Sequence, residues 1–468
     1  MDPTQHVAEF VTGLRYGDLS ARAVQVAKDA ILDSVGVALR GSQDEAGRIA
    51  ASLARDEAAA GEATVWGPSF RTSVAVAAFA NGIATHALDF DFSFMIGGQP
   101  MAGLVATVFA LAEASHATGA QLIEGYVAGY EVAGALLSCM PTHGGDAGWH
   151  STGTVGTLGC AAAACRLLGL DVERTRVALG IATSMASGVV WNFGSMSKPL
   201  HAGLAARNGV TAARLAASGF SANPSLLDGP DGFFATFAPA GAYDLAPLNQ
   251  LGATFAVEQG VRFKPYPCGG LTHTAVDATL GLCREESVEA ADVERVEVGV
   301  TAGTARRIIY GIPATALQGK FSIPYIIGRA IVDRALVPDS FTDEAIRDPR
   351  VISMAERVTM VVDPELKDSY SVSRPSRVRI ALKNGRALVR RSDVARGSPQ
   401  NPLSREELLE KFRICARPLL RPDALEAVLD GLEHLETTRD VAAITARFSM
   451  IGSEDLAPPA LGQGPAPG

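Results

Sequence analysis

The sequence predicts a large all-α helical domain and a smaller α+β domain, and three observations support this fold class. Residues 20–219 show helical periodicity with almost no strand signal. Alternation of apolar and polar residues, which is typical of strands, begins only after Gln259. Helical periodicity returns over 404–447. We therefore expect a discontinuous helical domain formed by 1–258 plus 394–454 and an α+β domain formed by 259–393. A disordered tail rich in Pro, Ala and Gly is expected over 455–468.

The helical pattern divides into segments with recognisable ends. Ser20 is a favourable N-cap, and apolar residues recur behind it up to Gly41. Gly219 provides a C-terminal stop for a later helix. Ser404, followed three residues later by an acid, begins the final helical segment, which is expected to rejoin the helical domain. The other expected helices cover 72–86, 103–118, 121–137, 152–170 and 198–218.

The α+β domain is predicted from strand-like alternation. Valines alternate with polar or small residues over 296–300, and 358–362 is a second candidate strand. Asn384-Gly385 separates two further alternating runs within 377–391, which predicts a β-hairpin with a type I′ turn. Helices are expected among these strands, near 272–283 and 320–336.

Composition excludes several functional classes. The 468 residues contain 41 Lys plus Arg and 50 Asp plus Glu, a net charge of −9, which argues against a nucleic-acid-binding protein. The chain shows no basic amphipathic stretch, no signal-peptide pattern and no apolar run of bilayer-spanning length. Its six cysteines lack C-x-x-C spacing and do not indicate a disulfide framework or a zinc site. We expect a cytoplasmic protein that binds neither nucleic acid nor a membrane.

Two carboxylates, Asp89 and Asp91, lie at the predicted end of an apolar helix in the segment Thr85-His-Ala-Leu-Asp-Phe-Asp-Phe-Ser93. A helix C-terminus disfavours anions, so these carboxylates require a cation, backbone N–H groups or a substrate as partner. A Gly-Gly-Gln99-Pro turn follows. The alternative interpretation is that one carboxylate merely caps the turn.

His150 and Lys198 stand near the starts of predicted helices, where free N–H groups favour an anion. His150, in Gly-Trp-His-Ser-Thr-Gly, is a candidate general acid or base, and the alternative is an ordinary loop histidine. Lys198, in Ser-Lys-Pro-Leu-His201, is a cation where the helix dipole does not favour one, which indicates an anionic partner. The alternative is a solvated surface lysine.

The segment Phe263-Lys-Pro-Tyr-Pro-Cys-Gly-Gly-Leu-Thr-His273 lies at the predicted domain boundary, where pockets commonly form. Lys264 and His273 are therefore candidates to face a cleft. In Lys320-Phe-Ser-Ile-Pro-Tyr325, the tyrosine is a candidate proton donor or polar clamp, and the alternative is a half-buried aromatic residue.

Recognised cofactor and nucleophile motifs are missing from the sequence. It contains no P-loop, no G-x-G-x-x-G fingerprint, no H-E-x-x-H zinc motif and no G-x-S-x-G nucleophile motif. The candidate residues are instead histidines, cations, a tyrosine and two carboxylates. We therefore expect acid/base chemistry on a small anionic substrate, without a cofactor or a metal ion.

The order and spacing of these motifs resemble those of the MmgE/PrpD family from about Ala8 to Phe448. The motifs are H-A-L-D-F-D, G-W-H-S-T-G, S-K-P-L-H-A-G, F-K-P-Y-P-C, K-F-S-I-P-Y and G-S-P-Q-N-P-L. The family includes 2-methylcitrate dehydratase, cis-aconitate decarboxylase and iminodisuccinate epimerase. The resemblance implies a large helical domain built from both ends of the chain, a smaller α+β lid and a homodimer.

The resemblance also carries a set of site residues onto this chain. It implies catalytic roles for Asp89, His150, Lys198, His273 and Tyr325. Binding of a small carboxylate substrate is expected of Ser93, Gln99, Lys264 and Lys320.

The chain departs from the family pattern where Phe92 replaces an Asp and Gln99 replaces a His. A neutral amide hydrogen-bonds a carboxylate but does not shuttle a proton near neutral pH. The leading hypothesis is a cofactor-independent, dehydratase-like lyase that removes a proton next to a carboxylate. Epimerisation or decarboxylation of a related acid, and a non-catalytic binding homodimer, are the alternatives.

Overall fold

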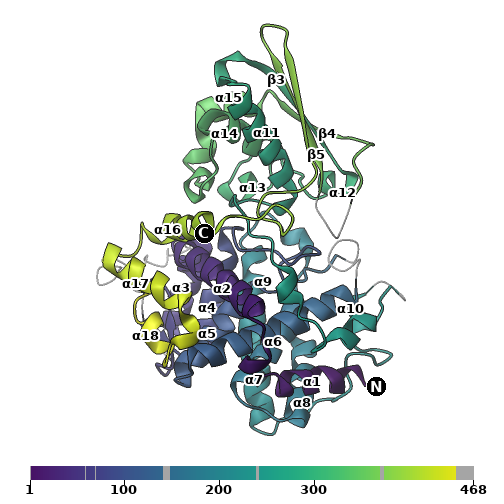
Figure 1. Ribbon diagram of the computed structural model, residues 1–468, viewed down its shortest axis with the longest axis vertical. Helices are drawn as coiled ribbons and strands as arrows, with labels where there is room; N and C mark the ends of the chain where they lie inside the picture. Colours follow the sequence, from purple (N-terminus) through teal and green to yellow (C-terminus); the bar gives the residue numbers. More distant parts are fainter. Residues whose placement is uncertain are drawn as a thin grey trace, which may run out of the picture.

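The computed structural model describes residues 2–57, 59–68, 70–140, 148–238, 242–368 and 374–448. It has two parts, each with its own hydrophobic core (Figure 1). The helical part contains both ends of the described chain, and the smaller α+β part, the lid, is formed by the stretch between them. The predicted tail at 455–468 lies outside the described residues. Within them, no helix is long and apolar enough to cross a membrane.

The helical part is a bundle of closely packed helices around one core. Ser20 caps α2 as predicted, because its side chain accepts a hydrogen bond from the backbone N–H of Ala23. Small residues allow close packing: a Cβ atom at Gly209 in α9 would lie 2.5 Å from Cβ of Cys160 in α7. The N-terminal helices are α1 (Pro3–Gly13), α2 (Ala21–Gly41), α3 (Glu45–Asp56), α4 (Val74–Ala87), α5 (Leu104–Ala114), α6 (Gly119–Ser138), α7 (Val155–Leu167), α8 (Val172–Met185), α9 (Ser197–Ala217) and α10 (Phe233–Phe237).

The C-terminal helices pack against the N-terminal ones (Figure 1). These helices are α16 (Arg405–Ala416), α17 (Pro422–Glu433) and α18 (Ala442–Thr445). Ser404 and Glu407 form the predicted capping box at the start of α16. Phe412 of α16 packs so closely on α2 that a Cβ atom at Gly36 would lie 2.8 Å from its ring. The last helical segment thus contributes to the same core as the first.

One element of the helical part departs from the all-α expectation. Strands β1 (Ala63–Val65) and β2 (Phe70–Thr72) form a small antiparallel pair between α3 and α4. Each strand has three residues, which is too short for a period of two to stand out in the sequence.

The lid consists of a four-stranded sheet with helices against it. The strand order is β4-β3-β5-β6, with β3 and β4 parallel and the other pairs antiparallel. The predicted alternation of valines lies in β3, where Val296, Val298 and Val300 are buried. The lid elements are α11 (His273–Glu285), β3 (Val293–Val300), α12 (Ala302–Ala305), α13 (Ala316–Gly319), α14 (Ile323–Asp333), α15 (Pro349–Ala355), β4 (Val358–Val362), β5 (Ser376–Leu382) and β6 (Ala387–Ser392).

The hairpin between β5 and β6 is present, but its turn is not the predicted type I′. That type requires positive φ at both central residues, and Gly385, with φ of 84°, has it whereas Asn384 does not. The backbone N–H of Leu382 donates to the carbonyl of Arg386, and that of Gly385 donates to the carbonyl of Leu382. These bonds define a three-residue loop in which Gly385 takes the left-handed position after a type I turn.

Candidate active site

A cavity of about 250 Å³ is lined by residues of both the helical part and the lid. The helical part contributes residues from the turn after α4, the loop before α7 and the start of α9, and the lid contributes the segment leading into α11. Seven of the nine predicted site residues line this cavity: Asp89, Ser93, Gln99, His150, Lys198, Lys264 and His273.

The charged side chains around the cavity are mostly cationic. Among the described residues that line it, six carry a positive charge and one is a carboxylate, Asp89. The cations are Lys198, Arg262, Lys264, Arg307, Arg374 and Arg396. The chain is acidic overall, so the cavity lining has a local excess of positive charge, which favours an anionic ligand.

Asp89 is held in place by two lysines. Its backbone adopts a left-handed conformation, with φ of 51°, directly after α4. Oδ1 of Asp89 accepts hydrogen bonds from Nζ of Lys198 at 2.9 Å and from Nζ of Lys264 at 2.8 Å. Burial alone would raise the pKa of Asp89, but the two ammonium groups outweigh it and hold the pKa well below its usual value. The anionic partner predicted for Lys198 is thus a residue of the protein itself.

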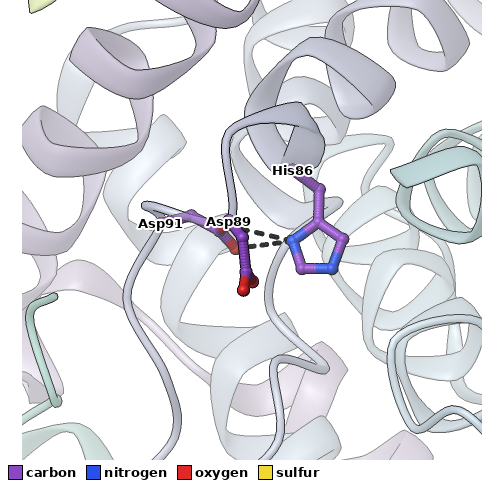
Figure 2. Close-up of side chains that lie close together, drawn as sticks. All are labelled: His86, Asp89 and Asp91. Carbon is purple, nitrogen blue, oxygen red and sulfur yellow. Dashed lines mark hydrogen bonds and ion pairs between the residues drawn. The ribbon is translucent and has the colours of Figure 1, made fainter. Parts of the chain in front are cut away.

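Asp91 lies behind this contact and holds the ring of His86. Both carboxylate oxygens of Asp91 are 3.0 Å from Nδ1 of His86, as the dashed lines in Figure 2 show. The other ring nitrogen of His86, Nε2, is 2.8 Å from Nζ of Lys198. We call His86, Asp89, Asp91, Lys198 and Lys264 the cavity cluster.

His86, Asp89 and Asp91 place donor atoms within 4.8 Å of one another, as the ligands of a metal ion would. Their existing partners argue against that use. Oδ1 of Asp89 already accepts from two ammonium groups, and Nε2 of His86 faces one of them. A divalent cation would compete with two positive charges that already neutralise the carboxylates. We therefore interpret these three residues as part of an ion cluster with the lysines.

His150 forms a pair with a second histidine, His201 of α9. Their Nδ1 atoms are 2.8 Å apart, so one ring donates and the other accepts. Burial lowers the pKa of His150 well below its usual value, and Lys198 lowers it further. Burial likewise lowers the pKa of His201 to about 4. Both imidazoles are therefore neutral near pH 7.

His273 is the first residue of α11 and is also neutral. Burial, together with the ammonium group of Lys264, lowers its pKa to about 3. Nε2 of His273 is 3.2 Å from the backbone carbonyl of Cys268. A carbonyl only accepts, so Nε2 carries the proton and Nδ1 is the ring nitrogen that can take one up.

Tyr325 and Lys320 are not among the residues that line the cavity, so the roles predicted for them stay predictions that this geometry does not support. Tyr325 is fully buried in the lid core, where its hydroxyl donates to the carbonyl of Ser340 and accepts from Arg329. Nζ of Lys320 donates to the carbonyl of Ala87 at 2.9 Å, beneath the turn that carries the carboxylates. Both side chains point to protein partners because of how α13 and α14 pack, which local sequence does not reveal.

The two positions at which the chain departs from the family pattern, Phe92 and Gln99, have different surroundings. Phe92 is buried against Tyr130 and Phe263 and does not line the cavity. Gln99 does line it, and its side-chain amide donates to the backbone carbonyl of Asp91 at 3.1 Å. An amide therefore occupies a position at the cavity wall and helps to hold the turn of the cavity cluster.

Sequence reasoning missed several residues of the site. His86 lies three residues before Asp89, and His201 lies three residues after Lys198. This spacing of one helical turn was the signal that could have placed both histidines at the site. The four arginines of the cavity come from separate segments with no shared motif. Nothing in the sequence indicated that they would converge.

Comparisons with known proteins agree with this architecture. The family model described as the MmgE/PrpD N-terminal domain matches residues 5–246, and the MmgE/PrpD C-terminal domain matches 266–435. The second match extends beyond the lid into α16 and α17, whose side chains pack in the helical core. The domain boundaries given above stay a prediction.

Three relatives are similar over nearly the whole chain. The cis-aconitate decarboxylase of Homo sapiens is 31% identical, over 94% of this chain and 93% of the relative. The cis-aconitate decarboxylase of Mus musculus is 30% identical, over 94% and 92%. That of Aspergillus terreus is 24% identical, over 94% of both chains. These matches confirm the family resemblance and the predicted fold class, and they favour an enzyme over a non-catalytic homodimer. The chain belongs to the MmgE/PrpD family, and it is an enzyme.

Proposed function

We propose that this enzyme is a lyase acting on a small polycarboxylate, and that its reaction is a decarboxylation of a cis-aconitate-type acid. The six cations around the cavity, against one carboxylate, carry this proposal. Asp89 accepts hydrogen bonds from both Lys198 and Lys264. Arg374 pairs with Asp368 and Arg396 pairs with Glu407, but neither of these carboxylates lines the cavity, so its lining keeps an excess of positive charge. A substrate with two or three carboxylates fits this charge.

Decarboxylation is favoured over the dehydration that led the sequence hypothesis for two reasons. The relatives that cover nearly the whole chain are cis-aconitate decarboxylases. In addition, the side chain of Gln99 cannot protonate a leaving hydroxyl group. A decarboxylation releases neutral carbon dioxide and requires no acid for its leaving group.

The residues of the cavity supply the remaining chemistry. When the C–C bond to the departing carboxylate breaks, its electron pair stays on the substrate and spreads towards a neighbouring carboxylate. The cations lining the cavity stabilise that charge. Lys198, in its ammonium form, then protonates carbon, because His150 and His273 are neutral near pH 7.

Proton NMR of the purified enzyme in heavy water tests the proposal. The enzyme is incubated separately with cis-aconitate, 2-methylcitrate and related acids, and carbon dioxide is measured in parallel. Carbon dioxide release from an unsaturated tricarboxylate is expected. Loss of a hydroxyl group would favour the dehydratase, and exchange of a C–H proton without elimination would favour the epimerase. No conversion of any acid, together with no ligand-induced shift in thermal unfolding, would contradict the proposal.

A further inference from the structure

Lys198 lies between two buried acceptors of different kinds. One is the carboxylate of Asp89, 2.9 Å away, and the other is Nε2 of His86, 2.8 Å away. His86 is held from behind by Asp91, whose two carboxylate oxygens are 3.0 Å from Nδ1 (Figure 2). Asp91, His86 and Lys198 therefore form a continuous hydrogen-bonded line that ends at the cavity.

The tautomer of His86 follows from its partners. An ionised carboxylate only accepts, so the proton of the neutral ring is on Nδ1. Burial would raise the pKa of Asp91, but His86 outweighs it and keeps the pKa below its usual value, so Asp91 is ionised. The lone pair of Nε2 consequently faces the ammonium group of Lys198.

We propose that Asp91 and His86 form a proton relay that switches Lys198 between its ammonium and amine forms. The relay makes Lys198 the proton-transfer group of the reaction proposed above, and the inference rests on that proposed function. In the step, one N–H bond at Nζ of Lys198 breaks and an N–H bond at Nε2 of His86 forms. The Nδ1–H of the resulting imidazolium stays on Asp91. The transfer reverses when the substrate is bound: the N–H bond at Nε2 of His86 breaks, the N–H bond at Nζ of Lys198 forms again, and the ammonium group protonates the carbanion.

The surroundings lower the pKa of both basic groups. Burial lowers the pKa of Lys198, and Lys264 lowers it further, while Asp89 and Asp91 oppose this. Burial also lowers the pKa of His86, but the adjacent Asp91 supports its imidazolium. The ring of His150 stacks on His86 at 5.9 Å between centroids and is itself paired with His201. In this arrangement, His86 and Asp91 are positioning residues that act through Lys198.

The protonation of Lys198 can be measured without a substrate. Acetic anhydride, a small neutral reagent, acetylates the neutral amine and not the ammonium form. The rate at Lys198 is followed by peptide mass spectrometry from about pH 6 to about pH 10, a range that ends near the usual lysine pKa. The full-length wild type is compared with His86→Gln, whose side chain can hydrogen-bond Lys198 but cannot take up its proton. His116→Gln is the matched control, because His116 also contacts a carboxylate, Asp440, at 2.9 Å but is exposed.

The relay predicts that, near pH 7, Lys198 reacts at least about tenfold faster in the wild type than in His86→Gln. The control His116→Gln should react as fast as the wild type. Equal rates in the wild type and His86→Gln would overturn the relay. If His86→Gln does not fold, the pH profile of the wild type decides. A plateau around neutral pH supports a shared proton, and a tenfold rise per pH unit throughout overturns it.

The catalytic part of the proposal is tested with whichever acid the wild type converts. His86→Gln is expected to lower kcat by about 10²- to 10⁴-fold with little change in KM. An unchanged kcat would overturn the role of the relay in catalysis. If the wild type converts no acid, the proposed function fails, and the acetylation profile still decides whether the relay exists.

Discussion

Two buried lysine–aspartate clusters lie on either side of the same turn, and only one of them faces the cavity. In the cavity cluster, Lys198 and Lys264 share Asp89. In the second, Nζ of Lys411 is 2.6 Å from Oδ1 of Asp33, and neither residue lines the cavity. Both clusters are buried, so burial of charge alone does not identify a catalytic site.

The clusters differ in where their remaining hydrogen bonds go. Lys411 donates to the backbone carbonyl of Phe90 at 2.8 Å, and the backbone N–H of Phe92 is 3.2 Å from Oδ2 of Asp33. The Asp33 pair thus holds the backbone on both sides of Asp91. Lys198 instead contacts a second proton acceptor, His86, at the cavity wall. Access to the cavity and a neighbouring proton acceptor are what distinguish the cavity cluster from the Asp33 pair.

The largest effect is expected from Lys198→Met, which keeps the side-chain length but removes the ammonium group. Turnover of the converted acid should fall by at least about 10³-fold, because the proton-transfer group is lost. The measurement is kcat by NMR or carbon dioxide release, with thermal unfolding as the control for folding. Activity within a few-fold of the wild type would remove Lys198 from the mechanism.

Lys411→Met is the matched change in the second cluster and should act on stability. It leaves the carboxylate of Asp33 buried without its cation, which costs about 3–5 kcal/mol of the free energy of unfolding. Urea unfolding measures this loss, and kcat of the folded variant should fall far less than in Lys198→Met. A loss of turnover as large as that of Lys198→Met would show that the two clusters are not functionally distinct.

Gln99→His restores an imidazole at the cavity wall and tests why decarboxylation is favoured. A histidine there can protonate a leaving hydroxyl group, so dehydration of 2-methylcitrate should rise by about tenfold or more. Product formation is followed by proton NMR, with Gln99→Asn as an amide control. If neither variant dehydrates the acid, the residue at position 99 does not set the choice of reaction.

The pH dependence of stability should also differ between the histidine pair at the cavity and the Asp33 pair. His201, paired with His150 at the cavity, has its pKa lowered from 6.5 to about 4 by burial, so its contribution to stability is complete above pH 6.5 and is lost as pH falls towards 4. The contribution of Asp33 to stability changes with pH in the opposite direction, because burial raises the pKa of its carboxyl group.

His201→Gln should therefore make stability less sensitive to acid. Between about pH 7 and about pH 5, the loss in free energy of unfolding should be smaller than in the wild type by on the order of 1–2 kcal/mol. Urea unfolding at both pH values measures this, with exposed His116→Gln as the control. The same slope in both variants would contradict the assignment.

The smallest effect is expected from Tyr325→Phe. The hydroxyl group bonds only within the lid, to Ser340 and Arg329, so its loss should cost about 1 kcal/mol of stability. The ratio kcat/KM should stay within about twofold of the wild type, since Tyr325 does not reach the cavity. A large fall in kcat without a change in stability would restore the role that the sequence suggested.

Local signals in the sequence predicted most of the elements. The Ser20 cap of α2, the capping box at Ser404 and the strand β4 all match, because each depends on neighbours within a few residues. The turn type predicted for the β5–β6 hairpin was wrong, because the pairing of the two strands leaves a loop of three residues and not two. The Asn-Gly pair alone therefore does not set the conformation of the turn.

The amino-acid sequence was enough to predict the family, the succession of helical and strand segments, and most of the polar residues that meet at the cavity. These depend on periodicity, caps and motif order, all of which are local. The packing of distant segments turns Tyr325 and Lys320 away from the cavity, places His86 against Lys198 and brings four arginines together. The direction of a side chain depends on which distant segment packs against its helix, and local periodicity carries no information about that partner.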